Sequence, residues 1–204
     1  MASKRIYLAS RSPRRRELLK QIGVSFELVL LREDPRRGPD VDETPLPDEA
    51  ADAYALRIAR SKAVVAVQQL ARRGLPLHPV LAADTTVVCD GAIIGKPADA
   101  EDAARILARL AGREHRVMTA VALAHRDEVA ARLSDSAVEF RTLAADEIRR
   151  YVASGEPLDK AGAYAVQGRA AAFVTRISGS YSGIMGLPLA DAAELLQRCG
   201  IEVL

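Results

Sequence analysis

The chain has few aromatic, cysteine and histidine side chains. Its 204 residues include no tryptophan, five tyrosines and three phenylalanines. The two cysteines, Cys89 and Cys199, lie far apart and form neither a CxxC pair nor a Cys/His zinc spacing, so we expect two reduced thiols. The three histidines, His78, His115 and His125, are scattered. This pattern favours neither a zinc site nor a Ser-His-Asp hydrolase.

The chain also lacks the segments that membranes and nucleic acids require. No run of about 20 apolar residues is present, and Arg11 to Arg16 interrupt any signal-peptide core near the start. Lys plus Arg is 29 and Asp plus Glu is 27, a net charge of +2, with no basic tail. We therefore expect a cytoplasmic protein that binds neither a membrane nor nucleic acid.

The residues that are present suit an α/β fold. Hydrophobic residues make up 49%, which is enough for a core of Ala, Val, Leu and Ile in one domain over residues 1–204, with two intimate lobes as the alternative. Segments with helical and strand periodicity alternate along the chain. Turn signals at Asp90-Gly91 and Arg126-Asp127 predict hairpins, so we expect a mixed sheet flanked by helices.

The expected elements follow from apolar periodicity and from capping residues such as Ser12, Pro13 and Asp99. We predict helices over residues 13–22, 48–72, 99–111, 147–153 and 189–199, and strands over 5–9, 24–31, 79–83 with 85–89, 92–94, 117–123, 129–140, 164–166, 172–177 and 201–204.

Four arginines gather at the predicted start of the first helix. Arg11, Arg14, Arg15 and Arg16 lie beside Ser12. Cations disfavour a helix N-terminus unless an anion lies among them, and unpaired backbone N–H groups there bind phosphate. The alternative is a solvated basic patch with Ser12 as an ordinary cap.

Two further segments suit phosphate and metal chemistry. The apolar run 79–83 ends at Asp84, and strand ends are where α/β sheets place functional acids, although Asp84 also suits a simple turn cap. Lys96 lies between a glycine and a proline, a dozen residues later, where an exposed hairpin lysine is the plainer interpretation. No Walker A, GxGxxG or GxSxG motif accompanies these residues.

Taken in order, several short motifs resemble the Maf family of nucleotide pyrophosphatases, once described as septum-formation inhibitors. The matching stretches are 8–10, 12–15, 17–19, 41–43, 57–59, 62–63, 83–85, 95–97, 155–168, 179–181 and 186–189. The resemblance implies an α/β fold with a central cleft, like the inosine-triphosphate pyrophosphatases. It also implies a homodimer that hydrolyses nucleoside triphosphates between the α and β phosphates with Mg²⁺ or Mn²⁺.

The resemblance assigns a role to each matching residue. Asp84 corresponds to the family's catalytic carboxylate, and Asp84 with Glu43 would hold the metal. The residues that match its phosphate-binding positions are Ser12, Arg15, Lys62 and Lys96. The residues that match its three specificity positions are Arg14, Thr85 and Gln167.

That specificity set indicates the dTTP/UTP branch, with modified pyrimidine nucleotides as further candidates. The predicted reaction is attack of water on the α phosphorus, with Asp84 as proton acceptor. Two other functions stay open from the sequence: a 7-methyl-GTP pyrophosphatase, and a nucleotide-binding regulator of cell division without turnover.

Overall fold

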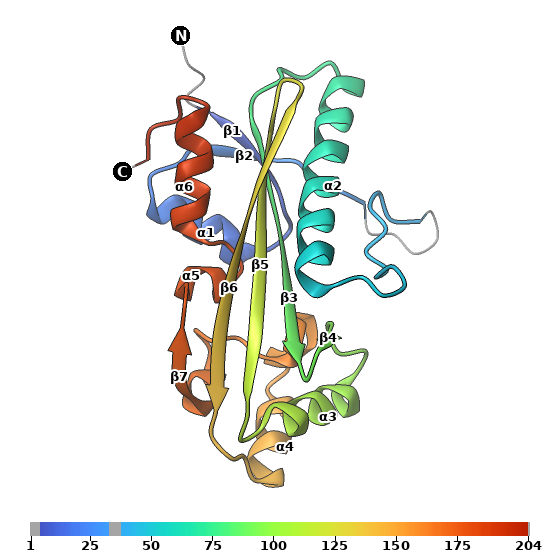
Figure 1. The fold of residues 1–204 in the computed structure, drawn as a ribbon, viewed down its shortest axis with the longest axis vertical. Helices are drawn as coiled ribbons and strands as arrows, with labels where there is room; N and C mark the ends of the chain where they lie inside the picture. Colours follow the sequence, from blue (N-terminus) through green and yellow to red (C-terminus); the bar gives the residue numbers. More distant parts are fainter. Residues whose placement is uncertain (1–4, 33–37, 204) are drawn as a thin grey trace. The chain divides into compact units, whose positions relative to one another are not determined.

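The computed structural model describes residues 5–32 and 38–203, and the chain divides into two compact units (Figure 1). Unit 1 comprises the described residues up to Asp84, Thr119–Ser134 and those from Gly186 onward. Unit 2 comprises Thr85–Met118 and Asp135–Met185. The expectation of a single domain, with its central cleft, stays a prediction.

The predicted α/β class with a mixed sheet is confirmed. Within the described residues, seven strands form one sheet in the order β2-β1-β3-β5-β6-β7, and β4 pairs with β3. The pairs β1–β2 and β1–β3 are parallel, whereas β3–β4 and β6–β7 are antiparallel. The strands are β1 (Ile6–Ala9), β2 (Phe26–Leu28), β3 (Val80–Cys89), β4 (Ala92–Ile94), β5 (Glu114–His125), β6 (Glu128–Phe140) and β7 (Val174–Ser178).

The helices of unit 1 cover both faces of its strands. They are α1 (Pro13–Gln21), α2 (Ala51–Arg72) and α6 (Leu189–Arg198). The buried face of α2 carries alanines at helical spacing, Ala55, Ala59, Ala63 and Ala66, which pack in one core with alternate residues of β1, β3 and β5. The opposite face of these strands is also buried, on the side of α1 and α6 in Figure 1. Small side chains let α2 approach the sheet closely.

Unit 2 has a larger and more varied core. It contains α3 (Ala100–Leu110), α4 (Ala145–Ala153), the short α5 (Tyr181–Met185) and the 3₁₀ turns η1 (Glu156–Asp159), η2 (Ala161–Ala163) and η3 (Arg169–Phe173). Phe140 lies at its centre, edge-on to Tyr164, Phe173 and His115. The Asp99 carboxylate accepts the Asp102 backbone N–H at 2.8 Å and caps α3, as predicted.

Several predicted elements are wrong or displaced. Residues 164–166 form no strand, although all three are buried, and 201–203 form none either. The second helix begins at Ala51 rather than Asp48, because Asp48 has a φ of 56° and cannot belong to a right-handed helix. The predicted strand 24–31 is reduced to Phe26–Leu28.

None of the helices formed by the described residues is long and apolar enough to cross a membrane. This agrees with the absence of a long apolar run in the sequence.

Candidate functional site

The part of β3 that belongs to unit 1 is buried and carries the carboxylate of Asp84. Val80 to Ala83 are fully covered, and Asp84 follows them with 7% of its surface exposed. The parallel pairing of β3 with β1 places Ala82 opposite Ala9, so this part of β3 lies beside the strand that leads into α1. An ionised carboxylate at such a depth requires a counter-ion.

Lys62 is that counter-ion, and it serves a second acid as well. Its Nζ lies 2.7 Å from Asp84 Oδ1 and 2.8 Å from Glu43 Oε1. The exposed fraction of the side chain is 16% for Lys62, 10% for Asp84 and 45% for Glu43. The three residues, from a loop, a helix and a strand, therefore form one charge cluster that opens to solvent on the Glu43 side.

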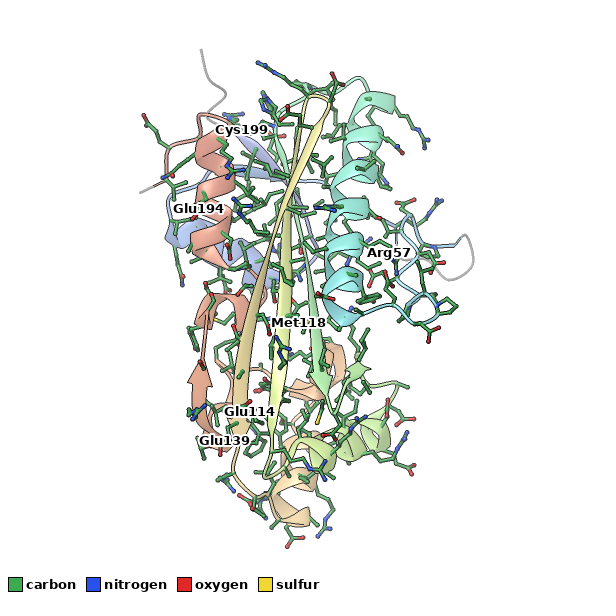
Figure 2. The ribbon with its side chains drawn as sticks, viewed as in Figure 1. Arg57, Glu114, Met118, Glu139, Glu194 and Cys199 are labelled. Atoms are coloured by element: carbon green, nitrogen blue, oxygen red, sulfur yellow. The ribbon has the colours of Figure 1, made fainter. Side chains whose placement is uncertain are left out.

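The loop that carries Glu43 is fixed by α2. Arg57 forms two hydrogen bonds of 2.6 Å with the Glu49 carboxylate and a third of 3.1 Å with the Thr44 carbonyl. Figure 2 shows Arg57 on the side of α2 that faces this loop. The Tyr54 hydroxyl donates to the Glu43 carbonyl at 2.9 Å. These bonds hold the Glu43 backbone next to Lys62 despite the long preceding loop, of which residues 33–37 lie outside the described structure.

The start of α1 contributes positive charge to unit 1. Pro13 occupies the first turn and no acidic residue lies there. Arg15 Nε donates to the Gly186 carbonyl and its Nη1 to the Ala83 carbonyl, both at 2.7 Å. Burial lowers the pKa of Arg15, and Arg14 lowers it further, whereas the charges of Asp84 and Glu43 oppose that change.

The other residues of the arginine cluster have different surroundings. Arg11 donates through Nε and Nη2 to the Leu31 carbonyl, at 3.2 and 2.9 Å, so it fixes the segment after β2. The Arg14 side chain forms no hydrogen bond or ion pair with any residue in 5–32 or 38–203, and its charge acts on Arg15. Ser12 occupies the N-cap position as predicted, but its side chain caps none of the described amides, and its N–H donates to Ser10 Oγ at 3.1 Å.

The remaining predicted site residues belong to unit 2. Thr85 follows Asp84 directly on β3 and is half-buried. Lys96 is exposed beyond the β3–β4 hairpin, where the Gly95 carbonyl accepts the Gly162 N–H at 3.0 Å. Gln167 is exposed on the turn before η3. Unit 1 thus holds Ser12, Arg14, Arg15, Glu43, Lys62 and Asp84, of which Glu43, Lys62 and Asp84 are in direct contact, while Thr85, Lys96 and Gln167 lie in unit 2.

Two polar residues of the cluster were missed in the sequence. Tyr54 received no role from the sequence, yet its hydroxyl bonds the Glu43 backbone, and burial, with the charges of Asp84 and Glu43, raises its pKa to about 12. Its position eight residues before Lys62 places both on one face of the helix and could have indicated the contact. Ser10 is buried, and its Oγ accepts from Ser12 N and, at 3.5 Å, from Arg15 Nη1.

The oxygen atoms of this cluster suit a hard divalent cation. Among the described residues no group of three or more His, Cys, Asp or Glu could hold a metal. Asp84 and Glu43 nevertheless share one ammonium, so their carboxylates already converge on a cation. Mg²⁺ usually takes one or two protein carboxylates and completes its shell with water and substrate phosphates. The pair would therefore suit a divalent cation that takes its other ligands from water and phosphate, and does not suit a site made by protein alone.

Comparisons with known proteins identify the family. The Maf-like protein family model matches residues 5–199. A dTTP/UTP pyrophosphatase of Aromatoleum aromaticum is 59% identical over 197 residues, covering 96% of each chain. One of Dechloromonas aromatica is 54% identical, covering 98% of this chain and 100% of its own. One of Nitrosomonas europaea is 55% identical, covering 97% and 96%.

A solved structure, that of the Staphylococcus aureus Ham1 protein, covers 96% of this chain and 97% of its own, with 16% sequence identity and a TM-score of 0.47. That likeness is too distant to indicate function. The family model spans nearly the whole chain, and the curated relatives are more than half identical to it. The resemblance drawn from the short motifs is thereby confirmed, and the chain belongs to the Maf family.

Proposed function

We propose that the protein hydrolyses dTTP and UTP to the nucleoside monophosphate and pyrophosphate. The observation that carries this is the identity of 54–59%, over nearly full length, to three proteins named dTTP/UTP pyrophosphatase. The cluster of unit 1 has chemistry that suits such a reaction. It combines cations that neutralise a triphosphate with carboxylates that can accept a proton or hold a metal.

Phosphate binding is assigned to the cationic side of the cluster. The start of α1, next to Ser12, suits an anion because the helix dipole places partial positive charge there and the first turn holds no acidic residue. Arg15 is held at two carbonyls, so its charge has a fixed position in unit 1. Lys62 lies between two carboxylates and would gain a third anionic partner in the phosphate. Fixed charges of this kind stabilise a transition state without reorganisation.

Asp84 is assigned the chemical step. The sequence placed Asp84 at a break between two strands, whereas it lies within the continuous strand β3. Its carboxylate is buried there and held by Lys62, so its orientation is set before substrate arrives. We propose that it accepts the proton of a water molecule that attacks the α phosphorus, and that pyrophosphate leaves. Glu43 is more exposed and is assigned to metal binding rather than to proton transfer.

We further propose that the reaction requires Mg²⁺ or Mn²⁺, which Asp84 and Glu43 would hold. A divalent cation there would screen the charge of the phosphates and of the leaving pyrophosphate. The test is removal of metal with a chelator. Turnover should disappear and return on addition of Mg²⁺ or Mn²⁺, and Glu43→Gln should raise the metal concentration needed for half-maximal rate.

Recognition of the base is assigned to Arg14, Thr85 and Gln167, and additional phosphate binding to Lys96. These assignments rest on the resemblance to the family. A Gln amide both donates and accepts, which suits the carbonyl and N–H of a pyrimidine ring. We also propose, on the same basis, a single functional domain, a cytoplasmic location and a homodimer. Light scattering should then give twice the chain mass of 21.9 kDa.

The experiment for the proposed function is a substrate panel. The wild-type protein is incubated with dTTP, UTP, dCTP, GTP and 7-methyl-GTP, and pyrophosphate release is measured. Asp84→Asn should abolish turnover while retaining nucleotide binding. Asp90→Asn is the matched control, because Asp90 follows β3 on an exposed turn with a φ of 52° that Asn adopts readily.

The outcomes separate the candidate functions. Turnover concentrated on dTTP and UTP, lost in Asp84→Asn and kept in Asp90→Asn, supports the proposal. Turnover on 7-methyl-GTP alone would keep the enzyme class and contradict the branch. Tight nucleotide binding without turnover by the wild type would favour the regulator.

A further inference from the structure

One carboxylate of unit 2 is bound to the turn that carries Gln167. Glu156 Oε1 accepts the Tyr151 hydroxyl at 2.9 Å and the Arg169 backbone N–H at 3.1 Å, and its Oε2 lies 3.2 Å from the same nitrogen. Glu156 therefore contacts the chain two residues after Gln167. The reaction described above gives this acid no part.

The glycine between Gln167 and Arg169 provides the space for that carboxylate. A Cβ added to Gly168 would lie 2.2 Å from Glu156 Oε1 and 2.8 Å from Oε2. Gly168 has a φ of −99°, which other residues adopt, so no unusual backbone angle demands glycine here. Glycine is needed at this position because the Glu156 carboxylate packs directly on the backbone.

Glu156 is itself held at several atoms. Its carbonyl accepts Lys160 Nζ at 2.7 Å, and its N–H donates to Ser154 Oγ at 3.3 Å. Tyr151 is 4% exposed and packs edge-on to Phe173. Burial and the hydrogen bond to Glu156 raise the pKa of Tyr151, so its hydroxyl keeps its proton and donates it.

The same Tyr151 hydroxyl reaches the other side of the turn. Its oxygen lies 3.4 Å from the Ala165 N–H, and the Ala165 carbonyl accepts the Gly168 N–H at 3.0 Å. The Tyr151–Glu156 pair thus touches the backbone before and after Gln167. Gln167 is exposed on this turn, whose backbone is hydrogen-bonded on both sides of it.

We propose that Glu156 is a positioning residue for substrate selection, which sets the place of the Gln167 amide by holding the backbone of Gly168 and Arg169. This inference rests on the proposed function, in which Gln167 reads the base. A long exposed side chain discriminates between bases only if its backbone is fixed to within a fraction of an ångström. Glu156 supplies that restraint without touching the substrate.

The test compares discrimination, not activity alone. kcat/KM is measured for UTP and for 7-methyl-GTP in wild type, Glu156→Ala, Glu156→Gln and Gly168→Ala. Glu156→Ala should lower kcat/KM for UTP about tenfold, mainly through KM, as expected for loss of one charged hydrogen bond. The value for 7-methyl-GTP should change little. Glu156→Gln keeps an accepting oxygen and should retain most of the discrimination.

The control is Glu147→Gln, which removes another paired carboxylate of unit 2 that binds Arg141. It should leave the UTP preference unchanged. Melting temperatures and far-UV circular dichroism identify variants that do not fold. If Glu156→Ala is among them, Glu156→Gln and Gly168→Ala test the inference in its place. Gly168→Ala should lose the preference for UTP because its methyl group displaces the Glu156 carboxylate.

A double variant shows whether Glu156 acts through Gln167. Gln167→Ala should lower the UTP preference, and adding Glu156→Ala to it should lower the preference no further. A merely structural role would instead give additive losses, equal for both nucleotides, and would overturn the inference.

The two proposals fail in different ways. Unchanged preference in Glu156→Ala, or in Gln167→Ala, would overturn the inference while wild-type turnover of UTP leaves the pyrophosphatase standing. Absence of wild-type turnover of dTTP and UTP would overturn the proposed function and this inference together.

Discussion

Acid should destabilise unit 2 through His115, which is buried without charge. Only 2% of its surface is exposed, and its Nε2 lies 2.8 Å from the Tyr164 hydroxyl. Phe140 and Tyr164 pack edge-on against its ring. Burial lowers the pKa of His115 from 6.5 to about 4, and the backbone of Arg113 opposes the change.

The size of the effect follows from the two pKa values. Above pH 6.5 the histidine is neutral in both the folded and unfolded chain, and its contribution to stability is complete. As the pH falls toward 4, only the unfolded chain takes up the proton, so the free energy of unfolding declines. The loss between pH 8 and pH 5 is about 2 kcal/mol, and the full shift corresponds to about 3 kcal/mol.

The assay is urea unfolding at pH 8 and pH 5, followed by far-UV circular dichroism. His115→Gln removes the titrating group and keeps a side chain that can bond Tyr164, so the variant should lose about 2 kcal/mol less on acidification than the wild type. His125→Gln is the control, because His125 ends the same strand β5 and is half-buried. Equal acid sensitivity of His115→Gln and wild type would refute the reasoning.

Two further predictions, each with its own control substitution, follow from contacts that lie within a single unit. Gly162 has a φ of 71°, and an added Cβ would lie 2.8 Å from Val87 Cγ2; Gly155 has a φ of 75° with nothing within 4 Å. Gly155→Ala should lower the free energy of unfolding by about 1 kcal/mol and Gly162→Ala by about 2–3 kcal/mol in urea titrations, and equal losses would exclude the close contact. Lys62→Met should lower kcat/KM for dTTP about a hundredfold. The exposed Lys20→Met should not, and wild-type kinetics in Lys62→Met would remove the lysine from the proposed mechanism.

Local signals in the sequence predicted the elements whose ends they control. The Asp90-Gly91 pair gave the β3–β4 hairpin, with Cys89 opposite Ala92, because both turn residues adopt positive φ. Asp99 caps α3 through its own side chain. In such cases the decisive interactions lie within a few residues, so the sequence contains them.

The two wrong strands show where local pattern fails. Tyr164 to Val166 are buried because Tyr164 packs on Phe140 and bonds His115, and not because they pair with a strand. Ile201 is buried too, but its N–H bonds the Leu196 carbonyl in the Schellman turn that ends α6 at Gly200, and not a strand. An apolar run in the sequence predicts burial. Whether it forms a strand depends on a hydrogen-bond partner far away in the sequence, which the run itself does not indicate.

The sequence predicted which residue types form the candidate site, but not which of these residues contact one another. Asp84 at the end of an apolar run indicated a functional acid from the sequence alone. Its pairing with Lys62, 22 residues away, and the reach of Glu43 to the same ammonium depend on how α2 packs on β3. Tyr54 was missed for the same reason, since its hydroxyl bonds the Glu43 carbonyl only after the loop packs on α2. Ser10 was missed although its bond with the Ser12 N–H is local.

The most direct test of the central claim is the fate of the water oxygen. The wild-type protein hydrolyses dTTP in ¹⁸O-labelled water, and the masses of the separated products are measured by mass spectrometry. Attack at the α phosphorus, aided by Asp84, predicts one labelled oxygen in dTMP and none in pyrophosphate. Label in pyrophosphate, or release of labelled orthophosphate with dTDP, would contradict the account.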